Sequence, residues 1–338
     1  MPVVSRIGFA ALVLALAAVR GSPVEAASGS TSPAGKRQPA SRAFFSPTGV
    51  DIVFTSDRSK NADIWLLAAD AMEPVNLTRH PFNDTRPEWS PDGRRIVFVS
   101  DRGGNGDVFV MNADGTALAQ LTTDKDHDFA PTWSPDGKTI AFLSWRAEAG
   151  DTARANHVYM MNADGASQRR VIAAQLGVPF EVVDADPGLS FSPDGTRLVF
   201  TRFSGGEEGC AIVVAGVDGG EERVVVNESG RSETGVALLG PVDLAPRFSP
   251  DGQWIAFACD DRAGTATIQV VKADGAQRRV VVPKGQNYDP RWSPDGKWLI
   301  YSAGKYPERD VRAVEVQSGE VVPLITGKSV DQHGGWRP

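Results

Sequence analysis

The chain has 338 residues, of which 41% are hydrophobic and 23% are charged, and its formal net charge is −7. The apolar fraction is sufficient for a packed core, and the acidic balance argues against a nucleic-acid partner bound through a broad basic surface. With 2 Cys and 4 His in the whole chain, multi-cysteine zinc sites and disulfide-dense scaffolds are excluded.

The first residues resemble an export signal rather than part of a fold. A single positive charge at Arg6 precedes an almost wholly apolar run over 7–19, and small residues follow near Ala26. This pattern predicts a secretory signal peptide over 1–26, because the apolar run is too short to span a bilayer comfortably. Residues 27–41 are rich in Ser, Pro, Ala and Gly and predict a flexible linker. We therefore expect a periplasmic or secreted protein that is not embedded in a membrane.

From residue 42 onward the chain repeats one short motif, an aromatic residue followed by Ser-Pro-Asp-Gly or a close variant. The aromatic residues are Phe45, Trp89, Trp133, Phe191, Phe248, Trp292 and, in a truncated last copy, Trp336. The steps between them are 44, 44, 58, 57, 44 and 44 residues. A period near 44 residues, with frequent Pro and Gly and no helical periodicity, is typical of a β-propeller with one unit per blade.

Each unit divides into four short strands. In the second unit, a strand ends at Trp89, β-prone residues occupy 95–100 and 107–111, and a fourth strand covers 118–122. Six complete sets of the later strands are present, but there are seven candidate first strands. We predict an all-β, six-bladed propeller over 42–338, made of four-stranded antiparallel blades. The C-terminal strand at 333–336 completes the blade built from 50–79 and displaces Arg42–Phe45, so that no sheet edge stays open.

The repeat resembles that of the TolB family's propeller. The resemblance rests on the run from Pro87 to Arg102 (Pro-Glu-Trp-Ser-Pro-Asp-Gly-Arg-Arg-Ile-Val-Phe-Val-Ser-Asp-Arg), and it covers all six units. It implies a periplasmic propeller that binds proteins, the peptidoglycan-associated lipoprotein among them. Two departures matter, because the N-terminal α/β domain of TolB has no counterpart here and two units carry long insertions. Similar repeats also occur in prolyl-oligopeptidase-type enzymes and in oligogalacturonate lyases, but this chain has no Gly-x-Ser-x-Gly motif.

Polar residues recur five positions before each repeat aromatic. They are Asp84, Asp128, Asp186, Asp243, Asn287 and Asp331. Because this position precedes the innermost strand of each blade, the side chains are expected to surround one mouth of the central channel. Like charges about 7 Å apart repel by about 2 kcal/mol per pair at an effective dielectric of 20. One interpretation is a site for Ca²⁺ or for a cationic ligand group; the other is that each carboxylate caps its own loop.

The longest insertions are expected on the same rim of the propeller. Extra residues lie within 145–156, 173–188 and 227–244, where loops between the second and third strands and links between blades occur. Loops longer than their neighbours often carry function. Phe180, Leu238 and Leu239 are candidate ligand-binding residues there, and the alternative is a neutral insertion.

Histidines and cysteines supply the remaining candidates. His127 and His333 lie next to the acidic positions and are candidate ligand-binding residues; a catalytic base is the alternative role. Cys210 and Cys259 align to neighbouring blades and would form a disulfide after export if their geometry allowed it.

We therefore expect a monomeric, non-enzymatic scaffold that binds a protein or a peptidoglycan-associated envelope partner on this rim, with no cofactor beyond the candidate Ca²⁺. The alternative function is a single-domain enzyme, such as a metal-assisted carbohydrate lyase of the oligogalacturonate type.

Overall fold

A computed structural model describes six segments of the chain: 46–147, 156–176, 188–203, 210–228, 245–260 and 264–338. The chain divides into two units after Arg42, and every described element belongs to the second unit, Ala43–Pro338. The predicted signal peptide (1–26), linker (27–41) and displaced strand (Arg42–Phe45) lie outside the described residues, so they stay predictions. No helix in the described segments is long and apolar enough to cross a membrane.

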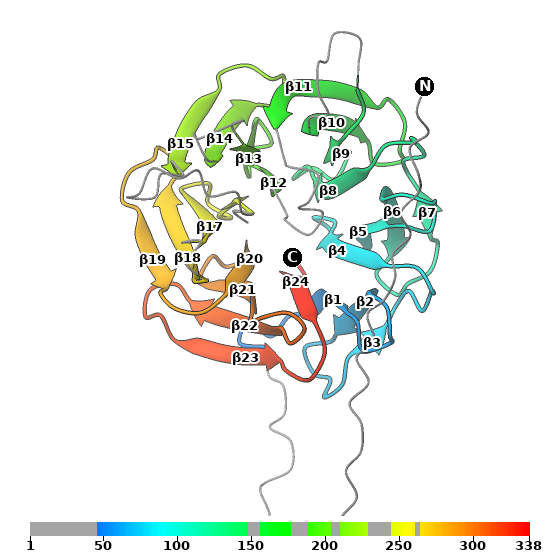
Figure 1. Cartoon of the computed structure of the whole chain (residues 1–338), viewed down its shortest axis with the longest axis vertical. Coiled ribbons are helices and arrows are strands. Elements are labelled where there is room, and N and C mark those ends of the chain that lie inside the picture. Colours follow the sequence, from blue (N-terminus) through cyan, green and yellow to red (C-terminus); the bar gives the residue numbers. More distant parts are fainter. Residues whose placement is uncertain (1–45, 148–155, 177–187, 204–209, 229–244, 261–263) are drawn as a thin grey trace, which may run out of the picture. The chain divides into compact units, whose positions relative to one another are not determined.

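The described strands form six separate four-stranded antiparallel sheets, which are the blades of a propeller (Figure 1). Listed from the axis outward, blade 1 contains β24 (Asp331–Trp336), β1 (Ile52–Ser56), β2 (Asp63–Leu67) and β3 (Val75–Asn76). Blade 2 contains β4 (Asp84–Trp89), β5 (Arg95–Ser100), β6 (Asp107–Asn112) and β7 (Ala119–Gln120), and blade 3 contains β8 (Asp128–Trp133), β9 (Thr139–Ser144), β10 (Asn156–Asn162) and β11 (Arg169–Leu176). Blade 4 contains β12 (Leu189–Phe191), β13 (Arg197–Phe203), β14 (Cys210–Gly216) and β15 (Arg223–Glu228). Blade 5 contains β16 (Arg247–Phe248), β17 (Trp254–Asp260), β18 (Ala266–Lys272) and β19 (Arg279–Val282), and blade 6 contains β20 (Asn287–Trp292), β21 (Trp298–Ala303), β22 (Asp310–Glu315) and β23 (Val321–Ile325).

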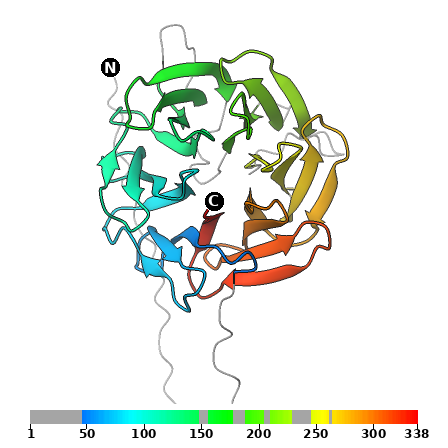
Figure 2. The same ribbon diagram turned by 180° about the vertical axis from the view of Figure 1, so that it is seen from behind.

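The last strand closes the ring, as predicted. Strand β24 pairs antiparallel with β1, with Asp331 opposite Ser56 and Gly335 opposite Val53. Figures 1 and 2 show this red strand beside the blue strands of blade 1 from both ends of the propeller. Because the two ends of the propeller share one sheet, neither is left with an unpaired inner edge.

Apolar side chains join each blade to the next. The described residues form six buried clusters, and each cluster combines strands of two neighbouring blades. One aromatic side chain from the second strand of each blade is buried at these interfaces: Phe54, Phe98, Phe142, Phe200, Phe257 and Tyr301. Burying such a ring contributes roughly 2–3 kcal/mol, so the blades depend on one another for stability.

The Ser-Pro-Asp-Gly turns are held by a repeated hydrogen-bond set. In blade 2 the Ser90 Oγ donates to Asp92 Oδ1 at 2.6 Å and accepts from the Arg95 backbone N–H at 2.9 Å. The equivalent Ser–Asp bond is present at Ser134, Ser192, Ser249 and Ser293. The Ser and the Asp are therefore local determinants of the turn, as is usual for these residue types.

The inner edge of every blade also shares one irregular backbone position. The residue three positions before the repeat aromatic has a positive φ in every blade: Arg86, Ala130, Gly188, Ala245, Asp289 and His333. In blade 2 the pairing of β4 with β5 shifts register between Thr85 and Glu88, which is a β-bulge with one extra residue on the inner strand. Since only one of the six is glycine, the fold accepts left-handed backbone strain at the other five positions.

Candidate functional site

The two ends of the propeller axis are formed by different parts of the repeat. All six innermost strands run in the same direction, from the position of Asp84 in blade 2 to the position of Trp89. We call the end where these strands begin the start rim, and the end with the Ser-Pro-Asp-Gly turns the turn rim. Asp84, Asp128, Asn287 and Asp331, the described positions of the predicted acidic ring, begin their strands and so lie at the start rim.

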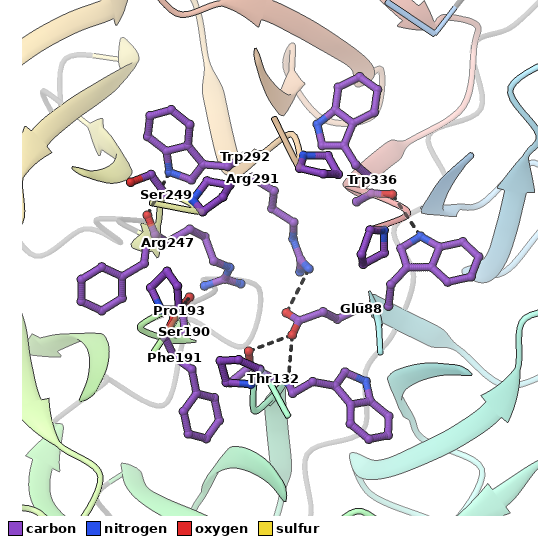
Figure 3. A pocket seen from close by; sticks show the side chains of 18 of the residues that line it. Glu88, Thr132, Ser190, Phe191, Pro193, Arg247, Ser249, Arg291, Trp292 and Trp336 are labelled. Carbon is purple, nitrogen blue, oxygen red and sulfur yellow. Dashed lines mark hydrogen bonds and ion pairs between the residues drawn. The ribbon is translucent and has the colours of Figure 1, made fainter. Parts of the chain in front are cut away.

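A cavity of about 310 Å³ lies on the axis near the turn rim and is lined by residues of all six blades. The residues directly before the repeat aromatics surround it, and Figure 3 shows five of their side chains around the opening: Glu88, Thr132, Ser190, Arg247 and Arg291. The sixth position is Gly335. Among the described lining residues, the charged ones are Glu88, Arg247 and Arg291.

Glu88 and Arg291 form an ion pair across the cavity. Arg291 Nη1 lies 3.2 Å from Glu88 Oε2, and the side chains are only 10% and 18% exposed. The other oxygen of Glu88 accepts from Thr132 Oγ1 at 2.7 Å and from the Trp133 backbone N–H at 3.0 Å. These partners fix the orientation of the Glu88 side chain.

The span from blade 6 to blade 2 depends on a glycine in blade 1. A Cβ built on Gly335 would lie 3.9 Å from both Cδ and Nη1 of Arg291. The Arg291 side chain therefore passes over the backbone of β24, and a large side chain at this position would occupy its path.

Arg247 lies beside Arg291 on the neighbouring blade, and its side chain points toward the centre in Figure 3. The residue is 8% exposed, and its Nη1 donates to the Pro246 carbonyl at 3.0 Å. The indole N–H of Trp292 donates to the Arg247 carbonyl at 3.1 Å, which joins blade 6 to blade 5 at this rim. Two guanidinium groups therefore line the cavity with one carboxylate.

The acidic positions of the start rim have arginine partners within their own blades. Asp84, Asp128 and Asp331 are fully buried. Arg102 Nη2 donates to Asp84 Oδ2 at 2.6 Å, and Arg58 Nη2 donates to Asp331 Oδ1 at 2.8 Å. Arg146 makes the equivalent ion pair with Asp128. The positive charges offset the repulsion expected between these carboxylates.

These arginines belong to the loops that follow the second strand of each blade. Arg58, Arg102 and Arg146 lie over the buried Phe54, Phe98 and Phe142, with distances of 5.4, 5.9 and 5.4 Å from the guanidinium carbon to the ring centroid. Nε of Arg58 donates to Ser56 Oγ, and Nε of Arg102 to Ser100 Oγ, both at 2.8 Å. Each arginine thus ties the innermost strand to the second strand of its blade.

Three positions of the predicted acidic ring remain: Asn287, Asp186 and Asp243. Asn287 Nδ2 donates to the Ala266 carbonyl at 2.8 Å, whereas Asp186 and Asp243 lie outside the described residues. Within the described segments, no group of three or more His, Cys, Asp or Glu side chains is arranged to hold a metal ion. The Ca²⁺ site stays a prediction, and a cation there would compete with the guanidinium groups.

Two buried carboxyl groups near the start rim have raised pKa values. Burial raises the pKa of Asp107 to about 6, against a hydrogen bond from Thr122, and the charge of Asp128 adds to the increase. Burial also raises the pKa of Asp128, which the hydrogen bonds from Ser144 and Arg146 oppose. The start rim therefore contains a carboxyl group that titrates close to neutral pH.

The predicted histidines lie in different blades and have local partners. His127, in the link before β8, accepts from the Gly106 backbone N–H at 3.1 Å, and its ring centroid lies 4.6 Å from that of Trp145. His333, inside β24, is 5% exposed and has its Nε2 3.6 Å from Asp289 Oδ2.

Several predicted residues cannot be placed. Phe180, Leu238 and Leu239 lie outside the described residues, and no side chain is described for Cys210. The predicted insertion surface and the pairing of Cys210 with Cys259 therefore stay predictions. On the described part of the start rim, Phe82 in the link before β4 and Tyr306 in the loop after β21 are 45% and 71% exposed.

The charged residues at the turn rim were not predicted. Their position is one residue before each repeat aromatic, where the units read Glu, Thr, Ser, Arg, Arg and Gly. Aligning the units at that position would have revealed the two arginines and the glutamate.

The fold and its repeated turns define a closed six-bladed β-propeller in which each blade has four strands. The model of the TolB β-propeller domain matches residues 27–156 and 190–338, and the chain belongs to this family. No significant match is found among curated protein sequences.

Solved structures share this fold at low sequence identity. TolB from Acinetobacter baumannii is similar with a TM-score of 0.69 and 17% identity, over 87% of this chain and 68% of that one. A structure assigned to TolB from Agrobacterium tumefaciens is similar with a TM-score of 0.60 and 18% identity, over 85% of this chain and 98% of that one. A chain of a nidogen–laminin complex is similar with a TM-score of 0.65 and 12% identity, over 86% of this chain and 98% of that one. At these identities the comparisons show a common fold.

Proposed function

We propose that this protein is a non-enzymatic binding scaffold of the cell envelope, and that it holds a protein or peptidoglycan-associated partner on its start rim. The observation that carries the proposal is membership of the TolB β-propeller family over nearly the whole propeller. The predicted signal peptide supports export to the periplasm or beyond. A monomer suffices for this role, because the closed ring completes its own core.

The described part of the start rim offers suitable anchor residues. Phe82 and Tyr306 are large aromatic side chains that stand exposed in loops of two different blades. The Phe82 ring stacks on His80, with ring centroids 5.2 Å apart, so its position is partly fixed before binding. Aromatic side chains are enriched among the residues that contribute most to protein–protein affinity.

The polar residues near the axis support binding rather than catalysis. Glu88 uses both oxygens on Thr132, the Trp133 N–H and Arg291, and Asp84 uses both on Arg102. A general base must be within hydrogen-bond reach of a substrate proton. Both carboxyl groups instead have their oxygens engaged by donors of the protein itself, which suits a structural role.

A capture experiment with matched variants tests the proposal. The tagged chain is incubated with envelope extract of its source organism, and bound proteins are quantified by mass spectrometry. A Phe82→Ser/Tyr306→Ser double variant is expected to lose at least one captured protein about tenfold or more. The control is Leu118→Ser, since Leu118 is 45% exposed beside the short turn at the other end of blade 2. Equal capture by all three proteins would contradict the proposed binding surface.

A further inference from the structure

We propose that a cavity between blades 5 and 6 is a binding site for an uncharged saccharide. The cavity has a volume of about 320 Å³ and lies at the turn rim. It is next to the axial cavity, with which it shares Trp292, Pro250 and Pro294. This inference goes beyond the proposed scaffold function, because it concerns the other end of the propeller and different residues.

The cavity coincides with the replacement of an arginine of the repeat by a tryptophan. In blades 2 and 4, the position six residues after the repeat aromatic is an arginine: Arg95 and Arg197. The Arg95 guanidinium carbon lies 4.6 Å from the ring centroid of Trp133, the repeat aromatic of the next blade. In blade 5 the same position is Trp254, which lines the cavity together with Trp292 of blade 6. Two indoles from neighbouring blades thus form the walls at this boundary.

Both indoles are held in place by their neighbours. Trp292 Nε1 donates to the Arg247 carbonyl at 3.1 Å. The guanidinium of Arg279 and the ammonium of Lys272 lie 5.7 and 6.0 Å from the ring centroid of Trp254. Because the rings are fixed before binding, little entropy is lost in ordering them. Indoles supply large apolar surfaces, which suit the C–H groups on one face of a sugar ring.

Polar groups of both kinds surround these apolar walls. The outer end is closed by Arg279 Nη1, which donates to the Val316 carbonyl at 2.8 Å and so joins blade 5 to blade 6. The donors and acceptors on long polar side chains of the lining are those of Asp251, Arg279, Asp295, Lys297, Glu315 and Gln317. A hydroxyl group both donates and accepts hydrogen bonds, so a saccharide can use either kind of partner.

The charges around the cavity do not favour an ionic ligand. The lining has three carboxylates and two cationic side chains, and some of them have partners already. Lys297 Nζ lies 3.8 Å from Asp295 Oδ2, and Glu315 accepts from the Ser318 backbone N–H. Asp251, Asp295 and Lys297 are exposed, so water and salt screen their charges. Apolar contact and hydrogen bonds to hydroxyl groups must therefore supply the affinity, and an uncharged saccharide offers both.

Titration of the whole protein with defined sugars tests this site. The uncharged probes are cellobiose, N,N′-diacetylchitobiose and the corresponding tetrasaccharide. The charged probes are cellobionate, which is anionic, and the dimer of glucosamine, which is cationic. Binding is followed by NMR through the indole N–H signals, and the expected Kd for an uncharged probe is on the order of 1 mM. The signals of Trp254 and Trp292 are expected to shift, and that of Trp298 is not.

The length of the probe distinguishes two sources of the ligand. Tighter binding of the tetrasaccharide than of N,N′-diacetylchitobiose indicates a site for a glycan strand. Equal affinity for the two indicates a site for a free small saccharide. A volume of about 320 Å³ lies at the small end of the range typical for ligand pockets, so either source would place only a short stretch of sugar inside.

Variants separate recognition from folding. Trp254→Arg introduces the residue that blades 2 and 4 have at this position, and it is expected to weaken the uncharged probes about tenfold or more. Trp298→Arg is the matched control, because Trp298 is the same position of blade 6 and lies outside the cavity lining. Gln317→Ala changes an exposed lining residue and is expected to weaken binding roughly threefold without disturbing the core.

Several results would overturn the inference. These are no saturable binding of any uncharged probe, tighter binding of a charged probe than of all the uncharged ones, or shifts confined to tryptophans outside the cavity. Unchanged affinity in both Trp254→Arg and Gln317→Ala, or an equal loss in Trp298→Arg and Trp254→Arg, would also overturn it. None of these outcomes bears on partner capture at the start rim, where Phe82 and Tyr306 are tested separately.

Discussion

Arg58 and Asp331 lie 273 positions apart in the chain, and their side chains form an ion pair with 2.8 Å between Nη2 and Oδ1. The pair joins the loop after β1 to the start of β24, so it connects the first and last described strands of the propeller. Arg102 and Asp84 make the same contact within blade 2, only 18 positions apart. The repeat thus uses one ion pair both to brace an ordinary blade and to close the ring.

Removing this arginine is expected to loosen the closing strand. Arg58→Met leaves the fully buried Asp331 without its charged partner, and we expect a loss of about 2–4 kcal/mol in the free energy of unfolding. Urea denaturation measures the loss, and hydrogen exchange should show faster exchange in β24. Lys138→Met is the control, because its ion pair with Asp136 is long (3.9 Å) and exposed and should contribute less than about 0.5 kcal/mol. Equal stability of Arg58→Met and the wild type would contradict the closing role.

The left-handed backbone conformation three residues before each repeat aromatic gives a second prediction. A Cβ at Gly188, where φ is +60°, would lie 2.6 Å from the Ala245 Cα. Gly188→Ala is therefore expected to destabilise the protein by at least about 2 kcal/mol through backbone strain and a clash with the neighbouring blade. Ala130→Gly, at the equivalent position of blade 3, relieves a positive φ and should change stability by less than about 1 kcal/mol. Thermal unfolding of the two variants makes the comparison, and the reverse order would contradict it.

Asp107 predicts a pH dependence of stability near neutrality. Burial raises its pKa from 3.8 to about 6, so the folded state binds the proton more tightly than the unfolded state. The resulting contribution is fully present below about pH 4 and is lost as the pH rises through about 6. Asp107→Asn should remove this decline, so that from pH 5 to pH 7 the wild type loses roughly 1 kcal/mol more of its free energy of unfolding than the variant does. Melting temperatures at several pH values test this, with the exposed Asp70→Asn as control; an unchanged decline in Asp107→Asn would contradict it.

The pKa of Asp194, the aspartate in the Ser-Pro-Asp-Gly turn of blade 4, is shifted in the opposite direction. Hydrogen bonds from Ser192 and from the Thr196 backbone and side chain lower the pKa of Asp194 to about 2. A lowered pKa gives stability that is present above the ordinary value of 3.8 and is lost as the pH falls through about 2. Ser192→Ala removes the first of these donors and is expected to shift acid unfolding to higher pH. Circular dichroism during acid titration measures the midpoint, and an unshifted midpoint would contradict the role of the turn.

The repeat made the fold predictable from sequence, because turn chemistry and strand propensity recur at fixed spacing. The six blades and closure by the strand ending at Trp336 are confirmed. The partners of the acidic positions were harder to predict, since Arg102 reaches Asp84 only once β4 and β5 are paired. The ion pair of Glu88 with Arg291 joins non-adjacent blades across Gly335. It depends on the curvature of the ring, which no local pattern encodes.

Site-specific photo-crosslinking in the intact envelope tests the central claim most directly. A photoreactive amino acid replaces Phe82 on the start rim or Leu118 at the other end of blade 2, and both side chains are exposed to the same extent. Our account predicts a discrete protein adduct from position 82 and none from position 118. Adducts from position 118 alone, or no difference between the two positions, would contradict the assignment of partner binding to the start rim.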